Sequence, residues 1–227
     1  MLIAEDLLLL LTDDVTGKPL VDSQRLTYAA AGAVLVELVL AERVAVTDGG
    51  RWGSGPRVAV VNPTPLGDPV LDAALSRVIA GRQPVGAASL LGGLGKGLLD
   101  ALRSRLAARG ILRREDGKVL GLFPTSAWPA VDSQHEAGLR WALRDVLLTG
   151  RTPTVREACL VALLHATDQV PKQFAADGVT RGQLRDRAKE ISAGNVGGEA
   201  VRRAIEAMNA AVIAGVTAAS VAAAGSS

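Results

Sequence analysis

The segment 24–41 constrains the fold more than any other part of the chain. Apolar residues recur along it at helical spacing and give a broad apolar face that the fold must bury. Apolar residues make up 48% of the 227-residue chain but aromatic residues only 3%, so alanine and leucine supply most of the bulk. This composition favours closely packed helices over a β-sandwich. We therefore predict a mainly α fold, with a single helical domain over residues 1–224 around a central helix bundle with short β-hairpins, and a disordered tail at 225–227.

Apolar periodicity, with residues typical of helix starts and stops, predicts further helices along the chain. They are expected at 69–81, 97–109, 133–148, 154–167, 180–192 and 199–224. Ser23 is expected to cap the helix at 24–41. Residues 2–12 are expected to form a short apolar helix or strand, and the glycine-rich segment 86–97 a flexible bend or a weak helix.

Two strand pairs are also expected. The first joins 43–46 to 57–61 through a glycine-rich turn. The second is a hairpin of 111–114 and 118–123 with its turn at Asp116-Gly117, a dipeptide that favours tight hairpin turns. Residues 124–129 are then expected to form a loop.

Charge and motif content exclude several classes of function. The formal net charge is only +2, which is far from the basic excess of a dedicated nucleic-acid binder. A single cysteine, Cys159, excludes an intramolecular disulfide and a cysteine-based zinc cage. The segment 92–97 fails the phosphate-loop pattern, because Leu90 stands where a glycine is needed and Gly97 where a serine or threonine is needed. We therefore expect no enzyme activity, no metal and no cofactor.

Two features of the first residues bear on location. The apolar run at 7–11 is too short to cross a bilayer, and acidic residues flank it. The chain starts with Glu5 and Asp6 where a signal peptide would carry basic residues. We expect a cytoplasmic protein that can lie peripherally on the inner face of a membrane.

Basic residues crowd the predicted helix and hairpin at 96–118. The segment 103–118 carries six basic and two acidic residues, and an apolar stretch follows it. Charge beside apolar residues suits a membrane surface, where each lysine or arginine contributes about 1 kcal/mol. The basic residues are Arg103, Arg105, Arg109, Arg113, Arg114 and Lys118, and the apolar ones are Val119, Leu120, Leu122 and Phe123.

Three other interpretations stay open for the same segment. It can be a solvated face beside a hairpin that packs inside the protein. It can be a soluble interaction module that self-associates through the hairpin at 111–123. It can also be a winged helix that binds duplex DNA, although the low net charge makes nucleic acid the weakest of the expected partners.

Blocks at 3–10, 31–38, 63–68, 102–112 and 163–168 occur in a recognisable order over nearly the whole chain. Together they resemble the Golgi phosphoprotein 3 family, which includes bacterial members. The resemblance implies a mostly helical, non-enzymatic fold around a central bundle. Eukaryotic members bind phosphatidylinositol 4-phosphate at the Golgi and act as adaptors for membrane enzymes. The implied partners are thus an anionic phospholipid such as phosphatidylinositol 4-phosphate, a protein client, and further copies of the chain.

The resemblance also implies where the headgroup binds. The family's Trp and Arg near the second block correspond to Val21 or Asp22 and to Ala31, and its two helix arginines correspond to Lys96 and Leu99. Only Lys96 keeps a positive charge. We therefore predict a headgroup site made by Lys96, with replacement charge from Arg103 and Arg25. The hairpin residues Val119, Leu120, Leu122 and Phe123 are implied to enter the membrane or to hold an oligomer together.

Overall fold

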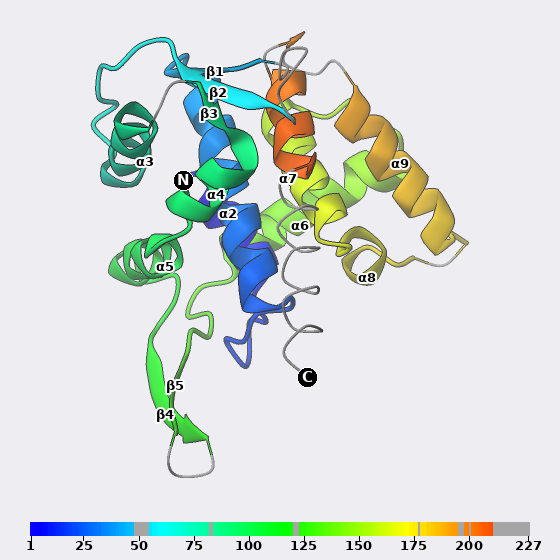
Figure 1. The fold of residues 1–227 in the computed structure, drawn as a ribbon. Coiled ribbons are helices and arrows are strands. Elements are labelled where there is room, and N and C mark those ends of the chain that lie inside the picture. Colours follow the sequence, from blue (N-terminus) through cyan, green and yellow to red (C-terminus); the bar gives the residue numbers. More distant parts are fainter. Residues whose placement is uncertain are drawn as a thin grey trace, which may run out of the picture.

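The computed structural model describes residues 1–47, 55–81, 84–119, 123–176, 178–194, 198–199 and 201–210. Helices dominate these residues, as predicted, and the strands form only two small antiparallel sheets (Figure 1). The helices are α1 (Ile3–Leu10), α2 (Ser23–Leu40), α3 (Pro69–Ala80), α4 (Ala87–Leu94), α5 (Leu98–Ala108), α6 (Gln134–Leu148), α7 (Val155–Ala166), α8 (Val170–Gln173) and α9 (Arg181–Ala193), followed by helical residues 201–210. The predicted tail at 225–227 and the predicted helix beyond 210 lie outside the described residues.

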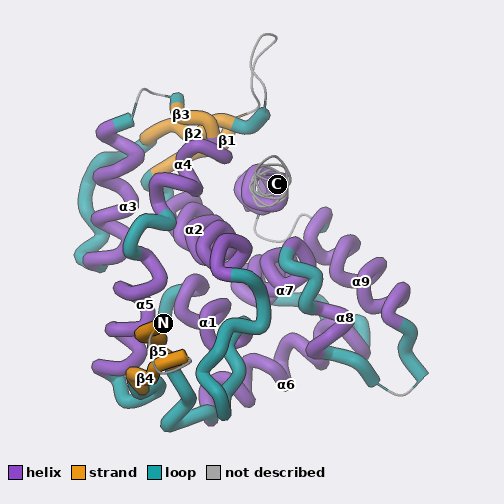
Figure 2. Tube along the Cα trace, turned by 60° about the horizontal axis from the view of Figure 1, so that its bottom comes forward, coloured by secondary structure: helices purple, strands orange, loops and turns teal. Residues whose placement is uncertain are grey.

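Helix α2 lies at the centre of the bundle, where α1, α3, α4, α5 and α7 all contact it (Figure 2). Every residue from 29 to 36 is buried, so the helix is covered on all sides rather than along one stripe. The predicted cap at Ser23 is wrong by one residue. The side chain of Asp22 caps the helix by accepting a hydrogen bond from the backbone N–H of Arg25 at 2.8 Å. A carboxylate at this position stabilises the first turn through both the hydrogen bond and the helix dipole.

Helix α1 is buried along its whole length, including two carboxylates that the fold must neutralise. Glu5 accepts hydrogen bonds from Arg105 Nε at 3.0 Å and from Arg109 Nη1 at 3.2 Å. Asp6 accepts from Arg156 Nε at 2.8 Å and lies 2.8 Å from His135 Nε2. Buried charges require such partners, and these partners connect α1 to α5, α7 and α6.

The first sheet has the strand order β1-β2-β3, with β1 at Val44–Thr47, β2 at Arg57–Val60 and β3 at Val85–Gly86. The predicted pair β1–β2 is confirmed, and Val44 pairs with Val60. The sequence did not predict β3, which is too short to show a period. Of the two alternatives for the segment 86–97, the helix is correct for α4, and a bend is correct only for the turn at 95–97.

The hairpin at 111–127 is present, but its predicted register is wrong. Strands β4 (Glu115–Val119) and β5 (Phe123–Ala127) pair Asp116 with Ser126, so the turn is not at Asp116-Gly117 and the loop predicted at 124–129 is mostly strand. A bridge between Leu112 and Ala130 sets the same register at the base of the hairpin. Ser126 Oγ also donates to the Asp116 carboxylate at 2.7 Å. Pairing at the base therefore overrides the local turn preference.

A buried carboxyl group makes the stability of the fold depend on pH. Burial, together with the facing carboxylate of Asp14, raises the pKa of Glu136 to about 8, although Arg140 opposes the shift. The folded state thus keeps a proton that the unfolded state releases near its ordinary pKa, so stability is full below about pH 4.5 and is lost as pH rises through about 8.

We expect the free energy of unfolding to fall by about 1–2 kcal/mol between pH 6 and pH 9, since solvent screens part of the charge. Urea unfolding at both pH values measures the fall. The Glu136→Gln variant cannot ionise at this position and should show a clearly smaller fall. Equal falls in the two proteins would contradict the assignment.

Candidate functional site

The three predicted headgroup residues, Lys96, Arg103 and Arg25, differ in the counter-charges that surround them. Lys96 is exposed in the turn between α4 and α5, and among the described residues no carboxylate lies within ion-pair distance of it. Arg103 faces Asp100 on its own helix at 3.8 Å. Arg25 faces Asp22 at 3.6 Å. Their roles in binding stay predictions, but Arg103 and Arg25 each have a local counter-charge and Lys96 does not.

The turn that carries Lys96 is held against the first part of α2. A Cβ atom added to Gly95 would lie 2.4 Å from Thr27 Cγ2, so only glycine allows this close approach. Lys96 and Arg25 therefore lie on neighbouring segments. Arg103 and Arg105 are two positions apart on α5, about 200° around the helix, and so project from opposite flanks.

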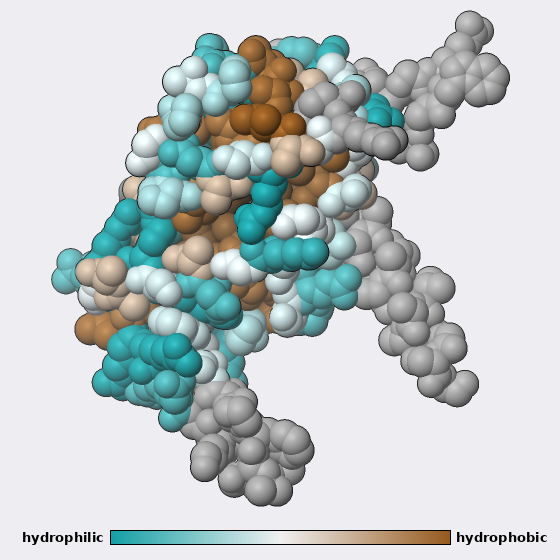
Figure 3. All heavy atoms as spheres, turned by 60° about the vertical axis from the view of Figure 1, so that its left-hand side comes forward, coloured by the Kyte–Doolittle hydropathy of each residue, from teal (hydrophilic) through white to brown (hydrophobic). Residues whose placement is uncertain are grey.

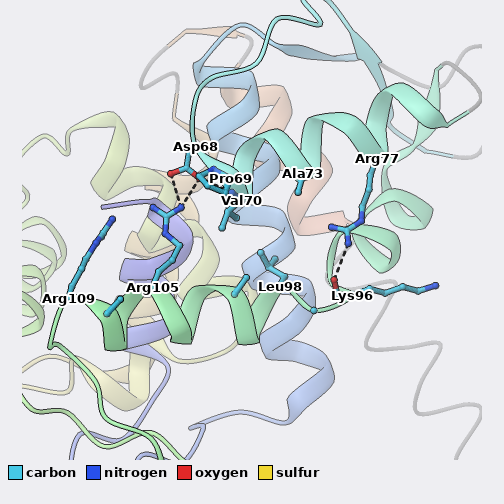
Figure 4. A pocket seen from close by; sticks show the side chains of 12 residues that line it. Asp68, Pro69, Val70, Ala73, Arg77, Lys96, Leu98, Arg105 and Arg109 are labelled. Atoms are coloured by element: carbon cyan, nitrogen blue, oxygen red, sulfur yellow. Dashed lines mark hydrogen bonds and ion pairs between the residues drawn. The ribbon is translucent and has the colours of Figure 1, made fainter.

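The flank of α5 that carries Arg105 forms a cleft of about 570 Å³ with α3. Figure 4 shows the two helices as its walls, with α3 above and α5 below. Positions on each helix recur at helical spacing toward the cleft, because residues three and four apart share a face. The lining residues are Asp68, Pro69, Val70, Ala73, Arg77, Lys96, Gly97, Leu98, Ala101, Arg105, Ala108 and Arg109.

The walls of the cleft are mainly apolar and made of small side chains. Ala73 on α3 and Ala101 and Ala108 on α5 are exposed, which means that no described side chain fills the space between the helices. Figure 3 shows apolar surface between hydrophilic side chains on the face that carries α3 and α5. A volume of this size, with mainly apolar walls and charged groups gathered at its two ends, is typical of small-molecule sites.

At one end of the cleft, acidic groups neutralise the positive charges. Arg105 Nη1 donates to both carboxylate oxygens of Asp68 at 2.7 Å (Figure 4). Its Nε donates to Glu5. Partial burial opposes the ionisation of Asp68, but Arg105 and the backbone N–H groups of the first turn of α3 outweigh it and hold its pKa below the usual value. Arg109 also contacts Glu5. This end is a structural ion-pair network.

At the other end of the cleft the described lining residues include cations but no carboxylate, and the nearby Asp100, in the first turn of α5, faces Arg103 instead. Arg77 Nη2 donates to the backbone carbonyl of Lys96 at 3.3 Å. Figure 4 shows the Lys96 side chain extending outward from this end. Gly97 has a φ of 71° and precedes the first residue of α5, and it offers no side chain to cap the helix. Two cations and an uncapped helix N-terminus thus meet here, an arrangement that favours an anion.

Arg105 and Arg109 belong to the basic cluster predicted from the sequence but not to the predicted headgroup site, and Arg77 belongs to neither. One signal was available, because Ala101, Arg105 and Ala108 follow one flank of the predicted helix at 97–109. No signal placed Arg77 beside them, since the contact depends on how α3 packs on α5.

The hairpin extends away from the body of the molecule beyond α5 (Figure 1). Val119 and Phe123 form its last cross-strand pair that the structure describes. The predicted contact residues Leu120 and Leu122 lie outside the described residues. At the base, the Arg114 guanidinium lies 5.9 Å from the ring centroid of Trp128, within cation–π range.

Two further findings limit the chemistry of the described residues. No group of three or more His, Cys, Asp or Glu side chains is arranged there to hold a metal ion. None of the helices in these parts of the chain combines the length and the hydropathy needed to cross a membrane. Cys159 is buried within α7, and burial raises the pKa of its thiol to about 12, so it is a core residue.

A comparison with protein families matches residues 3–208 to the family described as Golgi phosphoprotein 3 (GPP34). The match confirms the resemblance that the five sequence blocks indicate. No curated protein matches the chain in a direct comparison.

Proposed function

Because the chain belongs to the Golgi phosphoprotein 3 family, we propose that it is a non-enzymatic peripheral membrane protein that binds the headgroup of an anionic phospholipid. The observation that carries the proposal is the end of the α3–α5 cleft, where Arg77 and Lys96 have no acidic partner among the described residues. We name this end, Arg77 with Lys96 and Gly97, the cationic end.

The cationic end has the groups that a phosphate needs. The Arg77 guanidinium can donate two parallel hydrogen bonds, and the Lys96 ammonium contributes a mobile point charge. The first turn of α5 adds the positive end of its dipole. Arg103 and Arg25 are already paired with aspartates, so we assign them a smaller, long-range share of the attraction.

The hairpin supplies the second element of the proposal. Membrane association is stronger when apolar side chains enter the interface beside the basic surface. The hairpin extends from the body, and Val119 and Phe123 form its last described cross-strand pair. Leu120 and Leu122 lie between them in the sequence. We propose that these four residues contact the acyl region once the cationic end has bound the headgroups.

The test is vesicle co-sedimentation with a double variant, Arg77→Gln with Lys96→Gln. Neutral vesicles are compared with vesicles that carry phosphatidylserine, phosphatidylinositol or phosphatidylinositol 4-phosphate at matched charge. Two cations at about 1 kcal/mol each predict a loss of affinity of roughly 30-fold, and binding of the unaltered protein should weaken at high salt. Preference among lipids at equal charge identifies the headgroup.

The matched control is Arg181→Gln with Lys189→Gln on α9, on the far side of the bundle from α5 (Figure 1). Both side chains are exposed, and the control removes the same net charge. Equal losses of vesicle affinity in the two double variants would show that binding depends on net charge and not on a site at the cationic end. Absence of binding to every vesicle, with a mass that rises with concentration, would favour the alternative of a soluble module that self-associates through the hairpin at 111–123.

A further inference from the structure

We propose that the α3–α5 cleft holds the apolar chain of a single-chain anionic amphiphile whose acidic headgroup lies at the cationic end. The inference rests on the proposed function, since it uses the same headgroup position. Beyond the headgroup contact, the protein would also bind part of the ligand's hydrocarbon tail in the cleft.

The lining of the cleft supports a hydrocarbon occupant. Pro69, Val70, Leu98 and the three alanines form the apolar part of its walls, and the open cleft between them has a volume of about 570 Å³. The alanines are exposed and leave the space unfilled. Each methylene group buried against such walls makes the free energy of binding more favourable, in proportion to the apolar area that is removed from water.

The walls also argue against a peptide bound in an extended conformation. Both are α-helices, whose backbone N–H and C=O groups are bonded within the helix. An extended peptide laid in the cleft would find almost no backbone partners, and its own polar groups would lose their hydration. A hydrocarbon chain has no such groups to satisfy.

The charges give the ligand one orientation. At the end near Asp68, the carboxylates of Asp68 and Glu5 already occupy Arg105, and they would repel a second anion. At the cationic end, Arg77 and Lys96 have no such competitor among the described residues. A ligand with one acidic headgroup and one apolar chain fits this asymmetry, with the headgroup at Arg77 and the chain running toward Arg105.

The experiment uses dodecyl phosphate below its critical micelle concentration, titrated into the full chain by calorimetry. Glycerol 3-phosphate provides the headgroup without the chain, and dodecyl maltoside provides the chain without the charge. We expect saturable binding of dodecyl phosphate, at least tenfold tighter than that of either partial ligand. Absence of saturable binding, or equal binding of dodecyl maltoside, would overturn the proposal.

Variants that fill the cleft with a tryptophan side chain test whether dodecyl phosphate binds there. Ala101→Trp fills the cleft from α5, and Ala73→Trp fills it from α3, so each variant supports the other if one fails to fold. Ser104→Trp adds the same bulk at an exposed position of α5 outside the cleft. We expect at least a tenfold loss of dodecyl phosphate affinity in the two cleft variants and no change in Ser104→Trp.

The two proposals fail in different ways. Unchanged dodecyl phosphate affinity in both cleft variants would overturn the chain-binding inference, even if anionic vesicles still sediment the protein. Loss of vesicle binding in Arg77→Gln with Lys96→Gln, and its retention in Ala101→Trp, would support headgroup recognition at the cationic end separately from the chain. Absence of vesicle binding by the unaltered protein would overturn the proposed function.

Discussion

Replacement of Arg105 by methionine is expected to lower the free energy of unfolding by about 3 kcal/mol. Arg105 is the link between α5 and two carboxylates, one of them the fully buried Glu5 of α1. Methionine keeps much of the side-chain volume and the helix propensity, so the loss reports the missing charge. In a chain of this size the melting temperature should fall by roughly 6–12 °C.

The control is the same substitution two positions earlier, Arg103→Met. The side chains of Arg103 and Arg105 are similarly exposed, at 19% and 23%. Their partners differ, because Asp100 is 85% exposed and Glu5 is 0% exposed. Water replaces a lost partner for Asp100 but not for Glu5, so Arg103→Met should cost less than about 1 kcal/mol.

A double variant separates charge from packing. Glu5→Gln removes the buried charge but can still accept the hydrogen bond that the carboxylate receives from the Leu2 backbone N–H. Combined with Arg105→Met, it should lose less stability than the sum of the single variants. Urea unfolding of the four proteins gives the coupling. Additive losses, or equal costs for Arg103→Met and Arg105→Met, would show that Glu5 does not need Arg105 in addition to Arg109.

The sequence was sufficient where the periodicity is strong and local. The central helix at 24–41 carries apolar residues on all sides, and the helix starting at Asp68-Pro69 has both a cap and a favourable first residue. Gly110 follows α5 with a φ of 72°, as a helix-ending glycine should. These elements follow from short-range physics alone.

Register and charge pairing were beyond the sequence because they depend on contacts between distant residues. The Asp116-Gly117 turn is locally favourable, yet the pairing of Leu112 with Ala130 sets a different register. Glu5 and Asp6 precede their arginine partners by 100 to 150 positions. No spacing rule links such residues.

The candidate site shows the same division. The apolar and basic flanks of α5 could be read from the sequence, and so could the charge of Lys96. The cleft could not, because its other wall is α3, and Arg77 reaches the Lys96 carbonyl only after the two helices pack together. The basic segment is visible in the sequence, whereas the packing of α3 on α5 decides which cations have no acidic partner among the described residues.

A second large effect is expected at Gly32, at the centre of α2. A Cβ atom at this position would lie 2.4 Å from Met208 Cγ, so the helical residues 201–210 pack directly against the bare backbone of α2. Gly32→Leu must displace Met208 or the helix that carries it. We expect a loss of about 3 kcal/mol in the free energy of unfolding, because overpacking a dense core forces strained rotamers and backbone shifts.

Gly138 in α6 provides the opposite case. It also lies inside a helix, but a Cβ atom there would meet nothing within 4 Å. Gly138→Ala should therefore raise the free energy of unfolding by about 1 kcal/mol through helix propensity alone.

Shortening Met208 should relieve the clash at Gly32. The double variant Gly32→Leu with Met208→Ala should lose less stability than its two single variants together, because the leucine enters the space that the methionine leaves. Thermal and urea unfolding of the set measures this coupling. A neutral Gly32→Leu, or additive losses in the double variant, would mean that residues 201–210 do not pack on α2 in solution. The free energy of unfolding is thus expected to fall for Gly32→Leu and to rise for Gly138→Ala. The reason is the contact with Met208, because a Cβ atom at Gly32 would meet this side chain and a Cβ atom at Gly138 would meet nothing within 4 Å.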